Sequence, residues 1–108
     1  HAFAKLSGNR IDVVAEKQII SRDAVAGLYY FRRAGDFFGA AERLLAEATE
    51  GREVFVSSTY NLLIAAGQTV VGERITLEQR VEMGTPDDLS ASRAWLAQAH
   101  PPALAASK

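Results

Sequence analysis

The segment AVAGLYYF, at 24–31, limits the possible folds of this chain most strongly. It is apolar throughout and rich in aromatic and β-branched side chains, a composition typical of strands. The run predicts a strand over 24–33 that is covered on both faces, as in the sheets of α/β proteins. Gly27 interrupts this strand, and a glycine there marks a bulge or a close approach by a ligand or another backbone.

Further strand signals precede and follow this segment. The runs FAKL (3–6) and RIDVVAEK (10–17) flank the turn SGN (7–9), which predicts a β-hairpin. The runs EVFV (53–56) and QTVVGERI (68–75) predict two more strands. The chain therefore contains five strand candidates.

Two helices are predicted between these strands. The first has Asp36 as its N-cap, apolar side chains at helical spacing, and Gly51 at its end. The second is capped by SST at 57–59 and stops at Gly67. The hydroxyls of 57–59 lack the Gly-x-Ser-x-Gly frame of a nucleophile, so capping is the favoured interpretation of these residues.

A third helix is predicted from the stretch MGTPDDL, after a segment at 76–83 that fits either a strand or a loop. Thr85 is placed at the N-cap, Pro86 at N1, and Asp88 completes the spacing of a capping box. The helix is expected to run to about Ala99, followed by a tail at 100–108. Five strand candidates and three helices in one short chain favour an α/β fold.

The composition excludes several classes of function. The net charge is −1 and there is no basic run, which argues against nucleic-acid binding. There are no cysteines, so disulfides and thiolate metal sites are excluded, and a cytoplasmic location is expected. No apolar run approaches the length of a membrane span. His1 and His100 have no partner at metal-ligand spacing. The absent initiator methionine suggests that a segment once lay upstream.

Two places in the sequence, each containing a glutamate, are candidate sites. Glu16 and Lys17 end a predicted strand, where a carboxylate accepts from sugar hydroxyls and an ammonium pairs with phosphate. Glu82, before Gly84 and Thr85, has the oxygen ligands that a divalent cation prefers. On local grounds alone, a solvated charge pair is the favoured interpretation of Glu16 and Lys17, and a surface acid is the favoured interpretation of Glu82.

The motifs taken in order resemble the C-terminal half of a sugar-nucleotide nucleotidyltransferase, also called a nucleoside-diphosphate-sugar pyrophosphorylase. The resemblance covers about 3–97 and rests on an ordered set of motifs: VVAEK, AVAGLYYFRR, DFFGAAERLL, EVFVSSTYNLLIAAGQTVV and EMGTPDDL. It implies the mixed-sheet C-terminal portion of a nucleotide-diphospho-sugar transferase fold. The sugar-binding half would span 1–99. The parent enzyme would join a sugar 1-phosphate to a nucleoside triphosphate and release pyrophosphate, with Mg²⁺ as cofactor.

The resemblance also implies roles for individual residues. Glu16 and Lys17 would contact the sugar phosphate, and Gly27 would let the sugar lie against the backbone. Gly84 and Thr85 would form the Gly-Thr corner, and Glu82 would stand where the family usually has a metal-binding aspartate. No catalytic residue is assigned to this chain.

Two departures and one absence qualify these expectations. Gln18 replaces the proline that usually follows Glu-Lys, and Glu82 is one methylene longer than aspartate. The family's glycine-rich nucleotide loop is absent, so the chain is expected to be inactive alone. An open sheet edge where the missing half would pair predicts self-association. The alternative is a degenerate, non-catalytic module for binding or oligomerisation.

Overall fold

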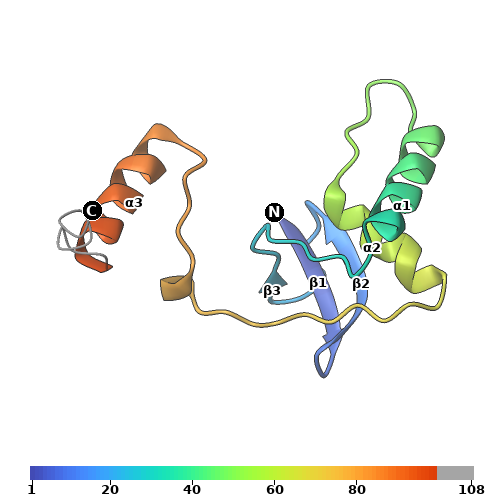
Figure 1. Cartoon of the computed structure of the whole chain (residues 1–108), viewed down its shortest axis with the longest axis horizontal. Coiled ribbons are helices and arrows are strands. Elements are labelled where there is room, and N and C mark those ends of the chain that lie inside the picture. Colours follow the sequence, from blue (N-terminus) through green and yellow to red (C-terminus); the bar gives the residue numbers. More distant parts are fainter. Residues whose placement is uncertain (100–108) are drawn as a thin grey trace. The chain divides into compact units, whose positions relative to one another are not determined.

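The structure, a computed structural model, describes residues 1–99, and the predicted tail at 100–108 lies outside the described residues. The chain divides into two compact units, His1–Arg74 and the residues from Ile75 onward. Each unit is described by itself below, with elements labelled as in Figure 1.

The first unit is built on the predicted hairpin. Strand β1 (Ala2–Ser7) pairs antiparallel with β2 (Arg10–Glu16), with Ala4 opposite Val14. The two-residue connection places Gly8 at a φ of 66°, which glycine adopts without steric cost, as in the hairpin turns with glycine at their first central position. The turn chemistry of SGN therefore predicted this part of the fold correctly.

The strand predicted over 24–33 is wrong. Only β3 (Asp23–Ala24) is a strand, and it pairs antiparallel with Phe3 and Ala4 of β1, which gives the sheet order β2-β1-β3. After β3, the amide of Val25 still donates to the carbonyl of Ala2 at 2.8 Å, but the described residues supply no further strand partner for this segment. The five-stranded mixed sheet is thus replaced, within residues 1–99, by a three-stranded antiparallel one.

The strand predicted at 68–75 is reduced to a short pairing along β2. Arg10 and Val71 form an isolated antiparallel bridge, with Ile11 donating to Val70 and Gly72 donating to Asn9. Figure 1 shows this segment, after α2, passing the turn end of the hairpin. At its end, Arg74 forms a two-point ion pair with the carboxylate of Asp23, at 3.0 and 3.1 Å.

Helix α1 (Ala34–Glu47) differs from the prediction at both ends. Its N-cap is Arg33 rather than Asp36, which lies in the first turn, where its charge still favours the positive end of the helix dipole. The helix ends before Gly51, with Ala48 as its C-cap.

Helix α2 (Val56–Ala65) begins earlier than predicted, so EVFV at 53–56 is not a strand and Ser57 to Thr59 lie inside the helix. Its C-terminus agrees with the prediction. Gly67 has a φ of 87°, its amide donates to Ile64, and the amide of Gln68 donates to Leu63, the Schellman pattern that ends helices.

The core of the first unit lies between the sheet and α2. Ala2, Ala4, Val14 and Tyr60 are buried together. Tyr60 is central, because its ring stacks on Phe31 with centroids 4.9 Å apart and its hydroxyl donates to the Tyr30 carbonyl at 2.8 Å. Partly buried side chains pack around this cluster: Leu6, Ile11, Val25, Tyr29, Phe31, Leu63 and Val70.

The second unit contains the third predicted helix. A short 3₁₀ helix (Leu77–Gln79) occupies part of 76–83, so that segment is not a strand. Helix α3 (Pro86–Ala99) then follows, and the hydroxyl of Thr85 accepts from the amide of Asp88 at 3.1 Å, which confirms Thr85 as its N-cap.

The described residues therefore form a mixed α/β structure, as expected from the sequence, with three strands and three α-helices. None of the helices among residues 1–99 has the length and apolarity needed to cross a membrane.

Candidate functional site

The carboxylate of Glu16 is held from the neighbouring helix. Glu16 is the last residue of β2, and Ser57, in the first turn of α2, donates its hydroxyl to Glu16 Oε2 at 2.9 Å. Ser57 itself is only 1% exposed. Because one carboxylate oxygen is engaged by a buried hydroxyl, the orientation of the other oxygen is restricted.

Lys17 follows with an unusual backbone. Its φ of 59° is the left-handed conformation, and its amide donates to the His1 carbonyl at 2.9 Å. The ammonium lies 3.7 Å from Glu53 Oε2 and 5.4 Å from the centroid of the Phe55 ring. Both charged side chains are largely exposed, so this ion pair is weak and water reaches the ammonium.

Gly27 lies in the irregular segment after β3. Its φ is 90°, and a Cβ built there would meet no heavy atom within 4 Å. The glycine is therefore required by backbone conformation rather than by a close neighbour. Two residues later, burial raises the pKa of Tyr29, and the negative charge of Glu16 raises it further, which relates this segment to the Glu16 carboxylate.

The other predicted site residues belong to the second unit. Thr85 uses its hydroxyl to cap α3, while a Cβ built on Gly84 would meet no heavy atom within 4 Å. Glu82 forms an ion pair with Arg80. These three residues thus lie around the start of α3, whereas Glu16, Lys17 and Gly27 belong to the first unit.

The only predicted metal ligand is Glu82, and the described residues contain no cluster of three or more potential metal ligands. Glu82 offers one carboxylate, already paired with a guanidinium. Across residues 1–99, no three His, Cys, Asp or Glu side chains are close enough together to hold one metal ion.

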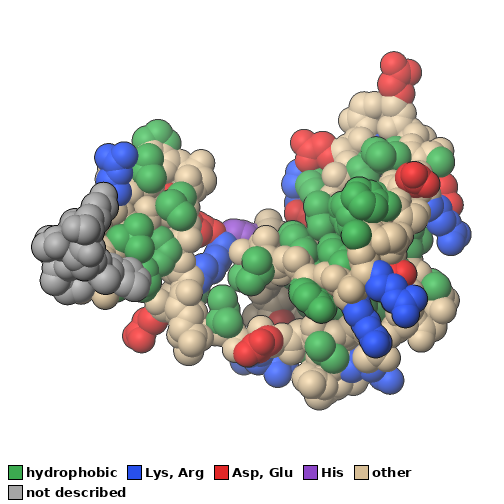
Figure 2. Space-filling model, in the orientation of Figure 1, with side chains coloured by type: hydrophobic (Ala, Val, Ile, Leu, Met, Phe, Trp, Pro, Cys, Tyr) green, Lys and Arg blue, Asp and Glu red, His purple; other side chains and the backbone are tan. Residues whose placement is uncertain are grey.

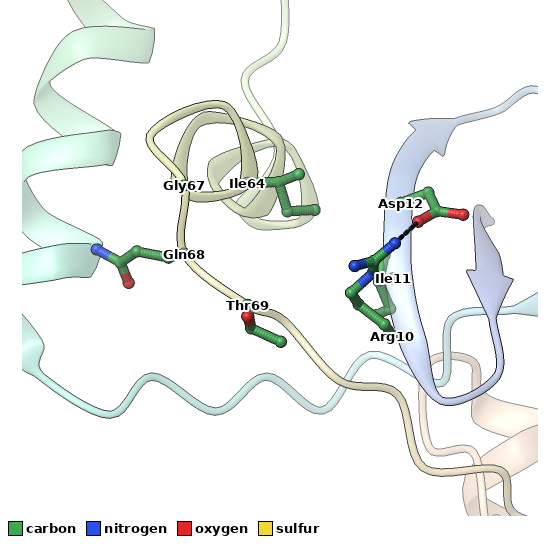
Figure 3. A pocket seen from close by; sticks show the side chains of 7 residues that line it. All are labelled: Arg10, Ile11, Asp12, Ile64, Gly67, Gln68 and Thr69. Atoms are coloured by element: carbon green, nitrogen blue, oxygen red, sulfur yellow. Dashed lines mark ion pairs between the residues drawn. The ribbon is translucent and has the colours of Figure 1, made fainter.

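Two hollows occur on the first unit. One, of about 280 Å³, lies between the start of β2 and the end of α2, where Arg10 pairs with Asp12 at 3.6 Å (Figure 3). The other, of about 540 Å³, is apolar and is lined by Tyr29, Tyr30, Phe31, Ala34, Phe37, Phe38 and Val56. Neither hollow is lined by Glu16 or Lys17. Tyr29 lines the second hollow, and the negative charge of Glu16 contributes to its raised pKa.

Sequence reasoning missed two polar side chains on α2. Ser57 was interpreted as a helix cap, and Asn61 was not singled out. Asn61 Nδ2 donates to the Val14 carbonyl at 2.7 Å, and its Oδ1 accepts from the Val14 amide at 2.8 Å. The four-residue spacing of Ser57 and Asn61 places them on one helix face, but their partners lie more than 40 residues away in the sequence.

The chain matches no known protein family, no curated protein and no solved structure.

Proposed function

We propose that this chain is the sugar-phosphate-binding portion of a nucleotidyltransferase. The whole enzyme would join a sugar 1-phosphate to the nucleotide part of a nucleoside triphosphate and release pyrophosphate. The proposal rests on one observation above the others: at the end of β2, the Glu16 carboxylate is held by a buried serine, and the next residue in the chain, Lys17, has an exposed ammonium. The cytoplasmic location belongs to the same proposal.

The chemistry of the pair suits a phosphorylated sugar. The Lys17 ammonium donates to phosphate oxygens, and ligand phosphate takes the place of Glu53, an exposed partner that is easily displaced. The second oxygen of Glu16 accepts from a sugar hydroxyl while Ser57 holds the first. Open space over Gly27 gives a sugar ring access to the backbone.

These residues bind and orient, and they do not carry a covalent intermediate. In the proposed reaction a phosphate oxygen of the sugar attacks the α-phosphorus of the triphosphate, and pyrophosphate leaves with the β- and γ-phosphates. Holding the attacking group in place contributes by proximity. The triphosphate, and the Mg²⁺ proposed for it, would be bound by the whole enzyme. The roles of Glu82, Gly84 and Thr85, which belong to the second unit, stay a prediction from the resemblance.

Removal of the ammonium tests the proposal. Lys17→Ala should weaken binding of a sugar 1-phosphate by about 1.5–3 kcal/mol, the usual contribution of a hydrogen bond to a charged group. Calorimetric titration of the chain with a panel of sugar 1-phosphates measures this loss. Lys5→Ala is the matched control, because Lys5 is exposed on β1 and makes no ion pair within the described part of the chain.

The same titration shows how the proposal fails. Equal affinity in the wild type and Lys17→Ala would remove Lys17 from the site. Equal losses in Lys17→Ala and Lys5→Ala would mean only that phosphate responds to net charge.

A second function, self-association, is favoured by the segment after β3. Its side chains alternate between packed and exposed, and the exposed ones include Leu28 at 92% and Tyr30 at 79%. Figure 2 shows hydrophobic side chains gathered on the surface of this unit. An apolar segment without a strand partner is a template for pairing with another chain. Light scattering after gel filtration should show concentration-dependent dimers that Tyr30→Lys abolishes; a monomer at every concentration would contradict this function.

A further inference from the structure

Helix α2 is attached to β2 at two points that have different functions. At the first point, the side-chain amide of Asn61 accepts a hydrogen bond from the N–H of Val14 and donates one to its C=O, as the backbone of a neighbouring strand would. At the second, one turn earlier, Ser57 donates to the carboxylate of Glu16. The two contacts lie on one face of α2 and two residues apart on β2.

The first contact fixes the helix, because two hydrogen bonds to one buried backbone unit permit little sliding or rotation. Val14 is 5% exposed and belongs to the core. The second contact then depends on the first, since Ser57 shares the rigid helix with Asn61. The hydroxyl of Ser57 is thereby held at a fixed position relative to the end of β2.

We propose that Ser57 is a positioning residue that sets the orientation of the Glu16 carboxylate, with Asn61 as the anchor that holds Ser57 in place. This inference rests on the proposed function and deepens it: Ser57 determines the preference for a sugar phosphate over phosphate alone. Inorganic phosphate needs only the Lys17 ammonium. A sugar 1-phosphate also needs the second oxygen of Glu16 to face its hydroxyls.

The position of Ser57 supports this role over simple helix capping. A cap would accept from an amide of its own helix, whereas Ser57 donates to a residue 41 positions earlier. Its burial means that water does not replace the hydroxyl when it is removed. Ser58, the next residue on the same helix, is more exposed and makes no side-chain hydrogen bond among those of the described residues. It therefore provides a matched control.

The test compares two probes, α-D-glucose 1-phosphate and inorganic phosphate, on the whole chain. Chemical-shift titrations by NMR measure weak affinities of both. Ser57→Ala should lower the affinity for glucose 1-phosphate roughly tenfold, because a hydrogen bond to a charged group contributes about that much. The same substitution should change the affinity for inorganic phosphate by less than about twofold. Ser58→Ala should change neither. In a Glu16→Ala background, Ser57→Ala should have no further effect on glucose 1-phosphate.

A structural role alone predicts a different result. If Ser57→Ala weakens both probes equally, the residue only maintains the fold and the inference is overturned. Ser57→Cys replaces the hydroxyl by a thiol, a weak donor of similar size, and serves as the second variant if Ser57→Ala does not fold.

A measurement without ligand separates this inference from the proposed function. Unfolding of wild type, Ser57→Ala, Glu16→Ala and the double variant forms a double-mutant cycle. The change in the folding equilibrium constant of the double variant should differ roughly tenfold from the product of the changes in the two single variants. Lack of coupling would overturn the positioning role. Coupling in a chain whose wild type binds neither probe would support the positioning of Glu16 by Ser57 and would refute the proposed function.

Discussion

Replacement of Asn61 by alanine should destabilise the first unit more than any exposed substitution. The side chain makes two hydrogen bonds to the buried backbone of Val14, at 2.7 and 2.8 Å. Each bond contributes about 1 kcal/mol, and a buried backbone group left without a partner costs about 1–3 kcal/mol. Because hydration replaces part of the loss, we expect a decrease of about 3 kcal/mol in the free energy of unfolding.

The two units can be followed separately during unfolding. All three tyrosines, Tyr29, Tyr30 and Tyr60, lie in the first unit, whereas the single tryptophan, Trp95, lies in the second. Near-ultraviolet circular dichroism of the tyrosines should therefore report on Asn61→Ala. For a unit of this size, 3 kcal/mol corresponds to a melting point lower by roughly 12–24 °C. Trp95 fluorescence gives the independent signal of the other unit.

Two variants decide whether the reasoning about Asn61 is correct. Asn61→Asp keeps an acceptor for the Val14 amide but sets a carboxylate oxygen against the Val14 carbonyl, so it should destabilise at least as strongly as alanine. Gln68→Ala removes an exposed amide side chain and should change stability by less than about 0.5 kcal/mol. A decrease for Asn61→Ala as small as that for Gln68→Ala would refute the argument.

Three other predictions concern the first unit. Gly67→Ala should cost about 1–2 kcal/mol in urea unfolding, because its φ of 87° is strained for alanine. Tyr60→Phe should cost about 0.5–1.5 kcal/mol through the lost bond to the Tyr30 carbonyl. Burial raises the pKa of Tyr60 above its ordinary 10.0. The stability contributed by the protonated Tyr60 side chain is therefore present below pH 10.0 and is lost as the pH rises through the folded-state pKa. A series of melting points at increasing pH measures this loss. The hydrogen bond from Arg74 lowers the pKa of Asp23 below 3.8. The stability contributed by this ion pair is therefore present above pH 3.8 and is lost as the pH falls through the folded-state pKa. Asp23→Asn should remove this pH dependence of the melting point.

Local turn and cap chemistry was the part of the fold that the sequence predicted well. The hairpin turn at Gly8, the end of α2 at Gly67 and the start of α3 at Thr85 all follow from interactions within a few residues. Such short-range contacts are encoded where they act, so a pattern of glycine, threonine and proline suffices to locate them.

The prediction of a central strand was wrong because strand formation depends on partners that are distant in the sequence. The segment 24–33 has the composition of a strand, but strand structure requires hydrogen bonds from a neighbour, and β1 pairs with only its first residues. The start of α2 was misplaced because Ser57 and Thr59 were interpreted as caps. Within the fold, Ser57 donates to Glu16, and Thr59 donates to the Val56 carbonyl of its own helix. The Ser57–Glu16 bond joins residues 41 positions apart, and such a long-range partner leaves no local signal in the sequence.

The backbone of Lys17 connects the fold to the proposed site. Among residues 1–99 it is the single non-glycine residue with a positive φ, a conformation that costs about 1–2 kcal/mol. Its amide donates to His1, and its exposed ammonium contacts Glu53 and the Phe55 ring, each side-chain contact contributing up to about 1 kcal/mol. Glycine is the chain's ordinary choice for such positions, at 8, 27, 51 and 67. A lysine here places an exposed ammonium directly after the Ser57-bound carboxylate of Glu16, in a backbone conformation that glycine would adopt at lower cost, and such local strain is typical of functional sites.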